Sequence, residues 1–338
     1  MQNFFTSFFL LFAFAACGFA QSVTLIPREQ ETRIDVEVDG RLFTSLRWDE
    51  RIRRPVLLPV MTAGGKFVTR GFPIETRDGE DMGHPHQVGA SLSFGDVNGI
   101  DFWNNSTFRT EKELEHMGRI VMRKIISMKN GNNRGELEYS AAWVDPKGKA
   151  LLLEVTKYIF HAKGKLRWID RETVLTADVD VVLGDNKEGL FAIHLNTALQ
   201  SEEEKTAKIT TATGVVSDRT STKGLTGKYL NSEGLEGTKI WGTAGKWAAV
   251  VGTLEGEAVT VAVFDRPQNL NYPANMMVRP YGLLALNPFG QKAYVPEKAE
   301  RKFTLAARRS ITFKHRLTIF SEKASREKIE AEFLNFTK

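Results

Sequence analysis

Alternation of hydrophobic and polar positions with a period of two residues dominates this sequence. Residues 34–38 read Ile-Asp-Val-Glu-Val, a pattern that places one face of a β-strand against a core and the other toward solvent. Asp39-Gly40 follows directly and is typical of a two-residue hairpin turn, so we expect the return strand over residues 41–48. Similar patterns predict further strands over residues 118–128, 135–144, 150–161, 165–176, 209–216, 246–254, 258–264 and 310–320.

Strands follow one another here without helices between them, which favours hairpins and meanders over βαβ units. We therefore predict an all-β fold, a large antiparallel β-sandwich of the supersandwich-like kind. One short C-terminal helix is expected over residues 326–333, with Ser325 as its N-cap. The Gly-rich polar stretch 223–237 is expected to be a surface loop, and residues 21–338 to form a single domain.

The N-terminus carries an almost uninterrupted apolar run over residues 4–16. A bilayer span needs roughly 20 residues, so this run predicts a secretory signal peptide, residues 1–20, with Gln21 as the mature start. Cys17 at the end of a loose lipobox is the alternative, in which the cysteine becomes a lipid anchor. The prediction is a periplasmic or secreted protein without an integral membrane span.

Composition narrows the function further. The formal net charge is +5 over 338 residues, and no block of Lys and Arg tracks phosphates, so nucleic-acid binding is not expected. Cys17 is the only cysteine. The mature chain therefore has no disulfide, thiol nucleophile or cysteine metal site.

Three segments carry the candidate chemistry, and the first is His84-Pro85-His86-Gln87. Pro85 biases the residue before it toward extended geometry, and residues two apart in an extended segment share a face. His84 and His86 could thus converge on one substrate or one metal. The alternative is a loop with two solvated or core-capping histidines.

The second segment is the acidic turn 184–189, which leads into a strand carrying His194. Glu188 and His194 at one strand end could act as acid and base. The alternative is a polar turn beside an ordinary strand histidine.

The third segment, residues 264–290, is an irregular stretch dense in Asn, Pro, Gly and aromatics. Long ordered loops are often functional, and amides, Arg forks and aromatic faces are the groups that hold a sugar ring. We expect Asn269, Arg279, Tyr281 and Asn287 to contact substrate, together with His116. The alternative is a loop that packs its own aromatics against the sandwich.

Together these segments resemble a family of unknown function that is often labelled "methane oxygenase PmoA". The resemblance rests on His84-Pro85-His86-Gln87, on Gly-Asp-Val-Asn-Gly-Ile-Asp-Phe-Trp at 95–103, on the turn 184–189, and on the signature over 267–290. Gln87 stands where this family usually has a second histidine, and Arg266 where a histidine precedes the proline. Both departures weaken a metal site built on histidines.

The methane-oxidation chemistry that the label implies does not fit this sequence. The membrane subunit of a methane monooxygenase crosses the bilayer several times, and each crossing needs an apolar run of roughly 20 residues, whereas no such run follows residue 16. The first hypothesis is an exported hydrolase or lyase acting on a small-molecule or oligosaccharide ligand. His84, His86, Glu188 and His194 would be catalytic, and no cofactor or metal would be required. The alternatives are a non-catalytic glycan-binding protein and a divalent-metal enzyme using His84 and His86. The sequence sets no oligomeric state.

Overall fold

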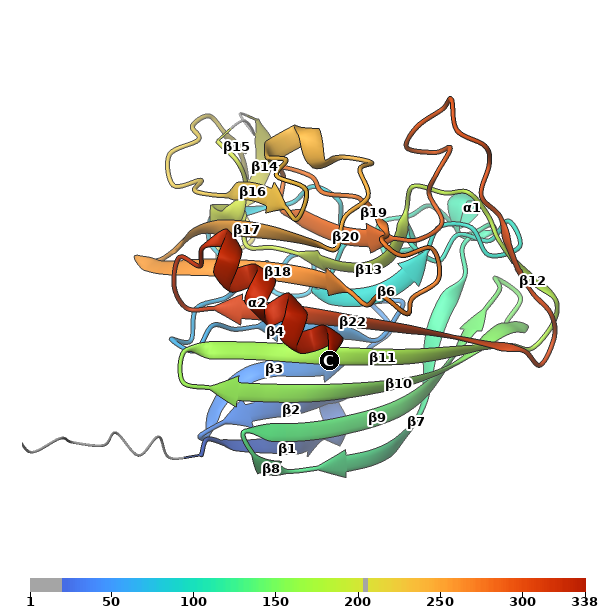
Figure 1. The fold of residues 1–338 in the computed structure, drawn as a ribbon, viewed down its shortest axis with the longest axis horizontal. Coiled ribbons are helices and arrows are strands. Elements are labelled where there is room, and N and C mark those ends of the chain that lie inside the picture. Colours follow the sequence, from blue (N-terminus) through green and yellow to red (C-terminus); the bar gives the residue numbers. More distant parts are fainter. Residues whose placement is uncertain (1–19, 203–205) are drawn as a thin grey trace, which may run out of the picture.

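The protein consists mainly of two large antiparallel sheets (Figure 1). The structure is a computed structural model that describes residues 20–202 and 206–338. The first sheet has the order β19 (Asn275–Met276), β20 (Leu283–Asn287), β13 (Gly189–His194), β6 (Ala90–Phe94), β4 (Val56–Val60), β3 (Arg41–Arg47), β2 (Arg33–Val38), β1 (Ser22–Arg28) and β8 (Gly131–Asn132). The second has the order β16 (Lys228–Asn231), β17 (Trp247–Leu254), β18 (Glu257–Asp265), β22 (Ser310–Phe320), β11 (Leu166–Ala177), β10 (Ala150–Lys163), β9 (Arg134–Val144) and β7 (Arg119–Lys129). The predicted all-β sandwich is confirmed.

Smaller elements complete the described part of the chain. β12 (Val181–Leu183) pairs with β21 (Phe303–Leu305), and β15 (Val216–Arg219), β14 (Ala207–Thr210) and β5 (Glu80–Asp81) form a three-stranded sheet. The helices are α1 (Glu111–Leu114) and α2 (Arg326–Thr337), and the 3-10 turns are η1 (Glu29–Glu31), η2 (Thr197–Leu199) and η3 (Gly237–Ile240).

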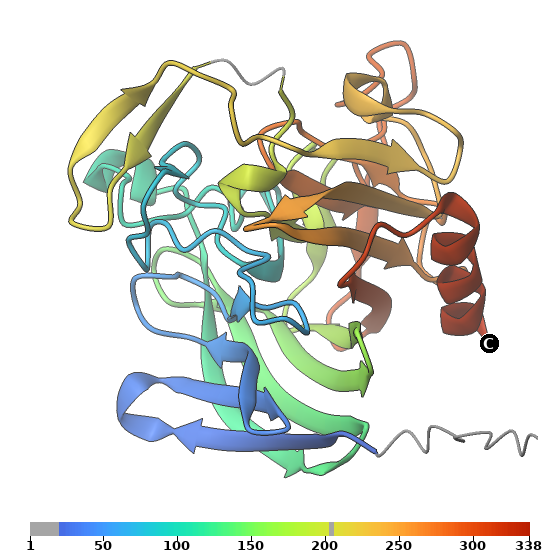
Figure 2. The same cartoon turned by 90° about the vertical axis from the view of Figure 1, so that its left-hand side faces the viewer.

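The core lies between the two large sheets, which face each other as two layers (Figure 2). Phe43 on β3 meets Phe160 on β10 edge to face, with 6.5 Å between ring centroids. β10 alternates buried and more exposed positions along its length, as a strand with one face on a core does. The long strands β9, β10, β11 and β22 are among those that period-two alternation predicted.

The outer face of the first sheet is also covered, over β13 and β20. Leu284 and Leu286 on β20 point into the main core, whereas Leu283 and Ala285 belong to a second apolar cluster. That cluster includes Trp103 from the loop after β6. Loops therefore pack on the back of the sandwich here, and the candidate residues lie among them.

Helix α2 confirms the predicted C-terminal helix and extends it to Thr337. Ser325 Oγ accepts a hydrogen bond from Lys328 N, as an N-cap does. Phe333 and Phe336 pack on Phe264 of β18, and Figure 1 shows α2 lying across this sheet.

Some sequence-based boundaries were wrong. The strand predicted over 209–216 is the end of β14, a turn with Gly214 at φ +84°, and the start of β15. The loop predicted over 223–237 contains the edge strand β16, and the irregular stretch 264–290 contains β19 and β20.

The predicted signal peptide and Cys17 lie outside the described residues, apart from Ala20. Among the residues that are described, no helix combines the length and the apolar character needed to cross a membrane.

Candidate functional site

The histidine turn follows β5 directly. Gln87 N donates a hydrogen bond to the His84 carbonyl over 3.0 Å and closes the turn around Pro85. His84 has φ +51°, so it adopts the left-handed conformation that few non-glycine residues accept, and not the extended geometry that Pro85 favours. His84 is exposed as a residue, although Tyr281 covers one face of its ring, whereas His86 is buried.

Two buried arginines hold this turn by its backbone carbonyls. Arg70 donates to the carbonyls of His84, at 2.6 Å, and Gln87, at 3.4 Å. Arg54 donates to the carbonyl of His86. The other acceptors of the two guanidinium groups are the carbonyls of Asp81, Phe102 and Trp103 and the hydroxyl of Ser93. Burial lowers the pKa of each arginine to about 10, so both remain cationic at neutral pH.

His194 lies at the end of β13, on the outer face of the sheet. Its Nδ1 is 2.9 Å from Gln87 Oε1, and Gln87 Nε2 donates to the Tyr281 hydroxyl over 3.4 Å. With the amide oxygen toward the ring, we assign the imidazole proton to Nδ1. Gln87, which stands where the resembling family has a histidine, thus joins a histidine to a tyrosine.

Tyr281 brings the third segment into the site. Its ring stacks on His84, with 4.1 Å between centroids and 12° between planes, and lies 5.9 Å from the ring of His194. Gly282, at φ +104°, allows the turn to sit this close, since a Cβ there would lie 3.3 Å from the Leu195 carbonyl. We call His84, His86, Gln87, His194 and Tyr281 the His–Tyr cluster.

Arg279 and Glu188 flank the His–Tyr cluster. The Arg279 guanidinium lies over the Trp241 ring, 3.4 Å from its centroid. Glu188 Oε1 pairs with Lys187 Nζ at 2.5 Å, while Glu188 Oε2 is buried without a hydrogen-bond partner. The charges of both Arg279 and Glu188 act on the pKa of Tyr281. Glu188 precedes β13 and His194 ends it, so these two residues lie at opposite ends of the strand and not at one end as predicted.

All three histidines of the cluster are held neutral. Burial lowers the pKa of His86 to about 2, with the charge of Arg54 as the second cause. Burial and then the charge of Arg70 also lower the pKa of His84 and of His194. Burial raises the pKa of Tyr281, so its hydroxyl stays protonated at neutral pH. The cluster therefore offers neutral imidazoles beside a proton-bearing phenol.

The remaining predicted substrate contacts lie elsewhere. Asn269 is buried and exchanges hydrogen bonds with Asp265 and the backbone of Lys314. Asn287 Nδ2 donates to the Asn186 carbonyl, at 2.8 Å, and to the Tyr294 hydroxyl. His116 is exposed, and its carbonyl accepts from Asp101 N. Asn269 and Asn287 shape the loops that carry the site, so we leave these three residues out of it.

Arg266, the second departure from the resembling family, also lies outside the site. It stacks on Phe336 and donates to the backbone carbonyls of Phe336 and Thr337. It therefore anchors the end of α2. No group of three or more His, Cys, Asp or Glu side chains within the described residues is arranged to hold a metal ion.

Sequence reasoning missed Arg54, Arg70 and Trp241, and it included Trp103 only as the end of the motif at 95–103. The only available signal was position, because Arg54 directly precedes the buried run that becomes β4. Arg54 and Trp103 line a cavity of about 10 Å³ together with His86, Gln87 and His194, which is room for about one water molecule. Trp103 Nε1 is buried there without a hydrogen-bond partner.

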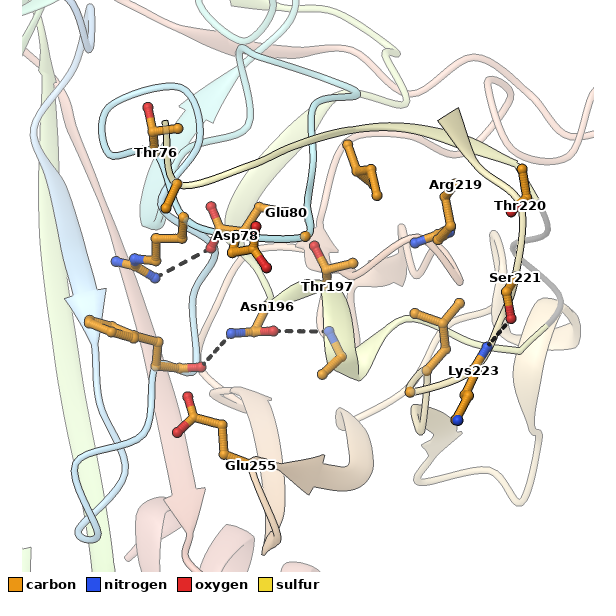
Figure 3. A pocket seen from close by; sticks show the side chains of 18 of the residues that line it. Thr76, Asp78, Glu80, Asn196, Thr197, Arg219, Thr220, Ser221, Lys223 and Glu255 are labelled. Carbon is orange, nitrogen blue, oxygen red and sulfur yellow. Dashed lines mark hydrogen bonds and ion pairs between the residues drawn. The ribbon is translucent and has the colours of Figure 1, made fainter. Parts of the chain in front are cut away.

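A wider cavity of about 850 Å³ lies beside β5. Figure 3 shows Thr76, Asp78 and Glu80 on one wall, Asn196 and Thr197 in the middle, and Arg219, Thr220, Ser221 and Lys223 on the opposite wall.

The two sites share a wall. Thr197 Oγ1 accepts from Asp81 N, and Gln200 Nε2 donates both to the Asp81 carboxylate and to the Tyr281 carbonyl, each at 3.0 Å. The wider cavity thus borders the His–Tyr cluster through Asp81 and Gln200.

A profile described as a family of unknown function (DUF6807) matches residues 33–334. The match supports an uncharacterised family, and the resemblance to the PmoA-labelled proteins stays a prediction. Comparison with curated proteins gives no match.

Solved structures with a similar arrangement include two α-galactosidases. AgaA from Geobacillus stearothermophilus is 11% identical with a TM-score of 0.41, and covers 89% of this chain and 41% of its own. The α-galactosidase from Lactobacillus brevis is 8% identical with a TM-score of 0.40, and covers 89% and 40%. The chain thus spans about two fifths of the length of these enzymes.

A third similar structure is Slr1438 from Synechocystis sp. PCC 6803, at 11% identity and a TM-score of 0.35, covering 89% of this chain and 96% of its own. With TM-scores below 0.5, these likenesses carry no argument about the activity of this chain.

Proposed function

The chain belongs to the DUF6807 family of unknown function, and we propose that its His–Tyr cluster is a catalytic site that cleaves a carbohydrate by acid–base chemistry. The observation that carries the proposal is the stacked pair of His84 and Tyr281, 4.1 Å apart, whose tyrosine hydroxyl is held by Gln87. A neutral imidazole and a protonated phenol side by side supply a base and an acid without a metal.

The roles follow from exposure and charge. His84 is exposed and neutral, so it is the base that can reach a ligand. Tyr281 is the acid, since its raised pKa keeps the proton on the hydroxyl. His194 is only 2% exposed and acts by positioning Gln87. His86, with a pKa of about 2, is too weak a base to take a proton at neutral pH and holds the turn instead.

The surroundings suit a polyhydroxylated ring. Glu188 Oε2 offers an acceptor for hydroxyl groups, and Arg279 offers donors. Because residues 1–20 read as a secretory leader, we propose that the reaction takes place in the periplasm or outside the cell.

The test compares turnover with affinity in two conservative variants. His84→Asn keeps a residue that tolerates the left-handed conformation but has no imidazole, and Tyr281→Phe keeps the ring but loses the hydroxyl. On the glycan that the native protein cleaves, we expect each variant to lose turnover by about 10²-fold or more while ligand affinity changes little.

Arg309→Ala serves as the control, because Arg309 is an exposed residue of the turn before β22 and outside the cluster. Unchanged turnover in Tyr281→Phe would refute the proposal. If the native protein binds glycans without cleaving any, and both variants alter only affinity, the protein is a glycan-binding protein and the catalytic proposal fails.

A further inference from the structure

The positively charged Arg279 has no acidic partner among the residues that the structure describes. Its guanidinium rests one face on Trp241, and it makes no hydrogen bond or ion pair within the described parts of the chain, 20–202 and 206–338. It is half-buried beside Tyr281. The guanidinium group is planar and has five N–H donors. When these donors have no partner in the protein, they are suited to a planar, bidentate acceptor such as a carboxylate.

The other cations around the His–Tyr cluster each have a carboxylate nearby. Glu188 is already paired with Lys187, and Asp81 lies 3.9 Å from Arg70. Arg54 is buried and donates hydrogen bonds to neutral acceptors, and the negative charge of Asp101 acts on it. Arg279 is therefore the cation beside the cluster that an anionic ligand would neutralise.

We infer that the substrate carries a carboxylate, as a uronic-acid glycan does, and that its glycosidic bond is broken by β-elimination; this inference rests on the proposed function above. Arg279 binds the carboxylate of the uronate ring, and the stacked His84–Tyr281 pair lies beside it.

The step balances without a co-reactant. The His84 lone pair takes the proton from C5, the carbon next to the carboxylate. The C5–H electrons form the C4=C5 double bond, and the bond from C4 to the bridging oxygen breaks. The leaving oxygen takes the Tyr281 proton. Arg279 stabilises the charge that develops on the carboxylate, and the imidazolium then returns a proton to the tyrosinate.

Hydrolysis suits this site less well. Glycosidases usually place two carboxyl groups across the scissile bond. Here Glu188 is the carboxylate whose charge acts on Tyr281, and one of its oxygens is bound to Lys187. Elimination requires a base, an acid and a cation for the carboxylate, and the cluster together with Arg279 supplies all three.

The experiment uses the native protein with polygalacturonate, alginate and glucuronan oligomers, and with the carboxyl-reduced form of each. Ultraviolet absorbance detects the new double bond conjugated with the carboxylate, and mass spectrometry detects whether water has been added. We expect one of the uronate chains to give an unsaturated product without added water, and its reduced form to remain intact.

Arg279→Ala should lower the rate by about 10²–10³-fold, and Arg279→Lys should restore only part of it, because lysine is a point charge. Arg309→Ala should leave the rate unchanged. Products that contain added water, or equal cleavage of a reduced chain, would overturn the inference and leave the proposed function in place. Binding without cleavage of any chain, native or reduced, would overturn both.

Discussion

At the scale of single residues, Asp265 is a buried carboxyl group that joins the sandwich to the loop following β18. It ends β18, where its carboxylate accepts hydrogen bonds from Asn269 Nδ2 at 2.6 Å and Ala274 N at 2.9 Å. His315 Nε2 lies 3.8 Å away. Asp265 thereby fixes the start of the loop that later presents Arg279.

Burial raises the pKa of Asp265 from 3.8 to about 6. Because the folded state holds this proton more tightly than the unfolded state, the stabilisation is fully present below about pH 4 and is lost as pH rises through 6. Asp265→Asn removes this titration. The amide of the variant points an N–H donor at one of the N–H groups that bind Asp265, which lowers the free energy of unfolding by an amount that does not depend on pH.

We therefore expect the free energy of unfolding of the native protein, relative to Asp265→Asn, to fall by about 2 kcal/mol between pH 4 and pH 7. Urea denaturation of both proteins across this range measures it. A difference between the two that does not vary with pH would show that Asp265 has an ordinary pKa.

Individual residue types also set how far the site could be predicted. His84, Tyr281 and Arg279 were recognisable because imidazole, phenol and guanidinium groups in turns often act on ligands. Asn269 and Asn287 belong to the same chemical class, but their amides are used inside the protein. Sequence alone does not separate an amide facing a ligand from one facing a backbone carbonyl.

At the scale of elements, several strands that alternation predicted have one covered face, although β18, which was also predicted, is buried from Val259 to Asp265. β10 and β11 alternate along their whole length. β4, β6 and β20 are buried at every position, because the core covers one face and the site loops cover the other. Such strands have no period of two, so the strands under the site were the ones that the pattern missed.

Helix α2 gives a prediction at this scale, since two neighbouring apolar residues differ in how deeply they are buried. Phe333 is 4% exposed and packs edge to face on Phe264, whereas Leu334 is 52% exposed. We expect Phe333→Ala to lower the free energy of unfolding by about 3–5 kcal/mol and Leu334→Ala to change it by less than about 0.5 kcal/mol.

Thermal and urea unfolding of the two variants measure the contrast. Equal effects would mean that α2 does not pack on the second sheet as described. Turnover at a temperature where Phe333→Ala is folded should match that of the native protein, because α2 contacts no residue of the His–Tyr cluster in the described structure.

At the scale of the whole molecule, the site exists because the sheet order is not the sequence order. β13 lies between β6 and β20, so the turn at 84–87 and the turn before β20 meet at the His194 end of β13, whereas the turn before β13 lies at the other end of that strand. Alternation and turn chemistry identify these segments one by one. The meeting of the first two depends on crossovers between distant strands and on the buried Arg54 and Arg70, which no local pattern reveals.

The most direct test of this account is a crystal structure of Tyr281→Phe with an uncleaved oligosaccharide that the native protein degrades. We predict a sugar ring at the His–Tyr cluster, with the His84 imidazole and the ring of the substituted residue both in contact with it. A sugar held only in the wider cavity, between Asn196 and Lys223 and with the cluster unoccupied, would contradict the account.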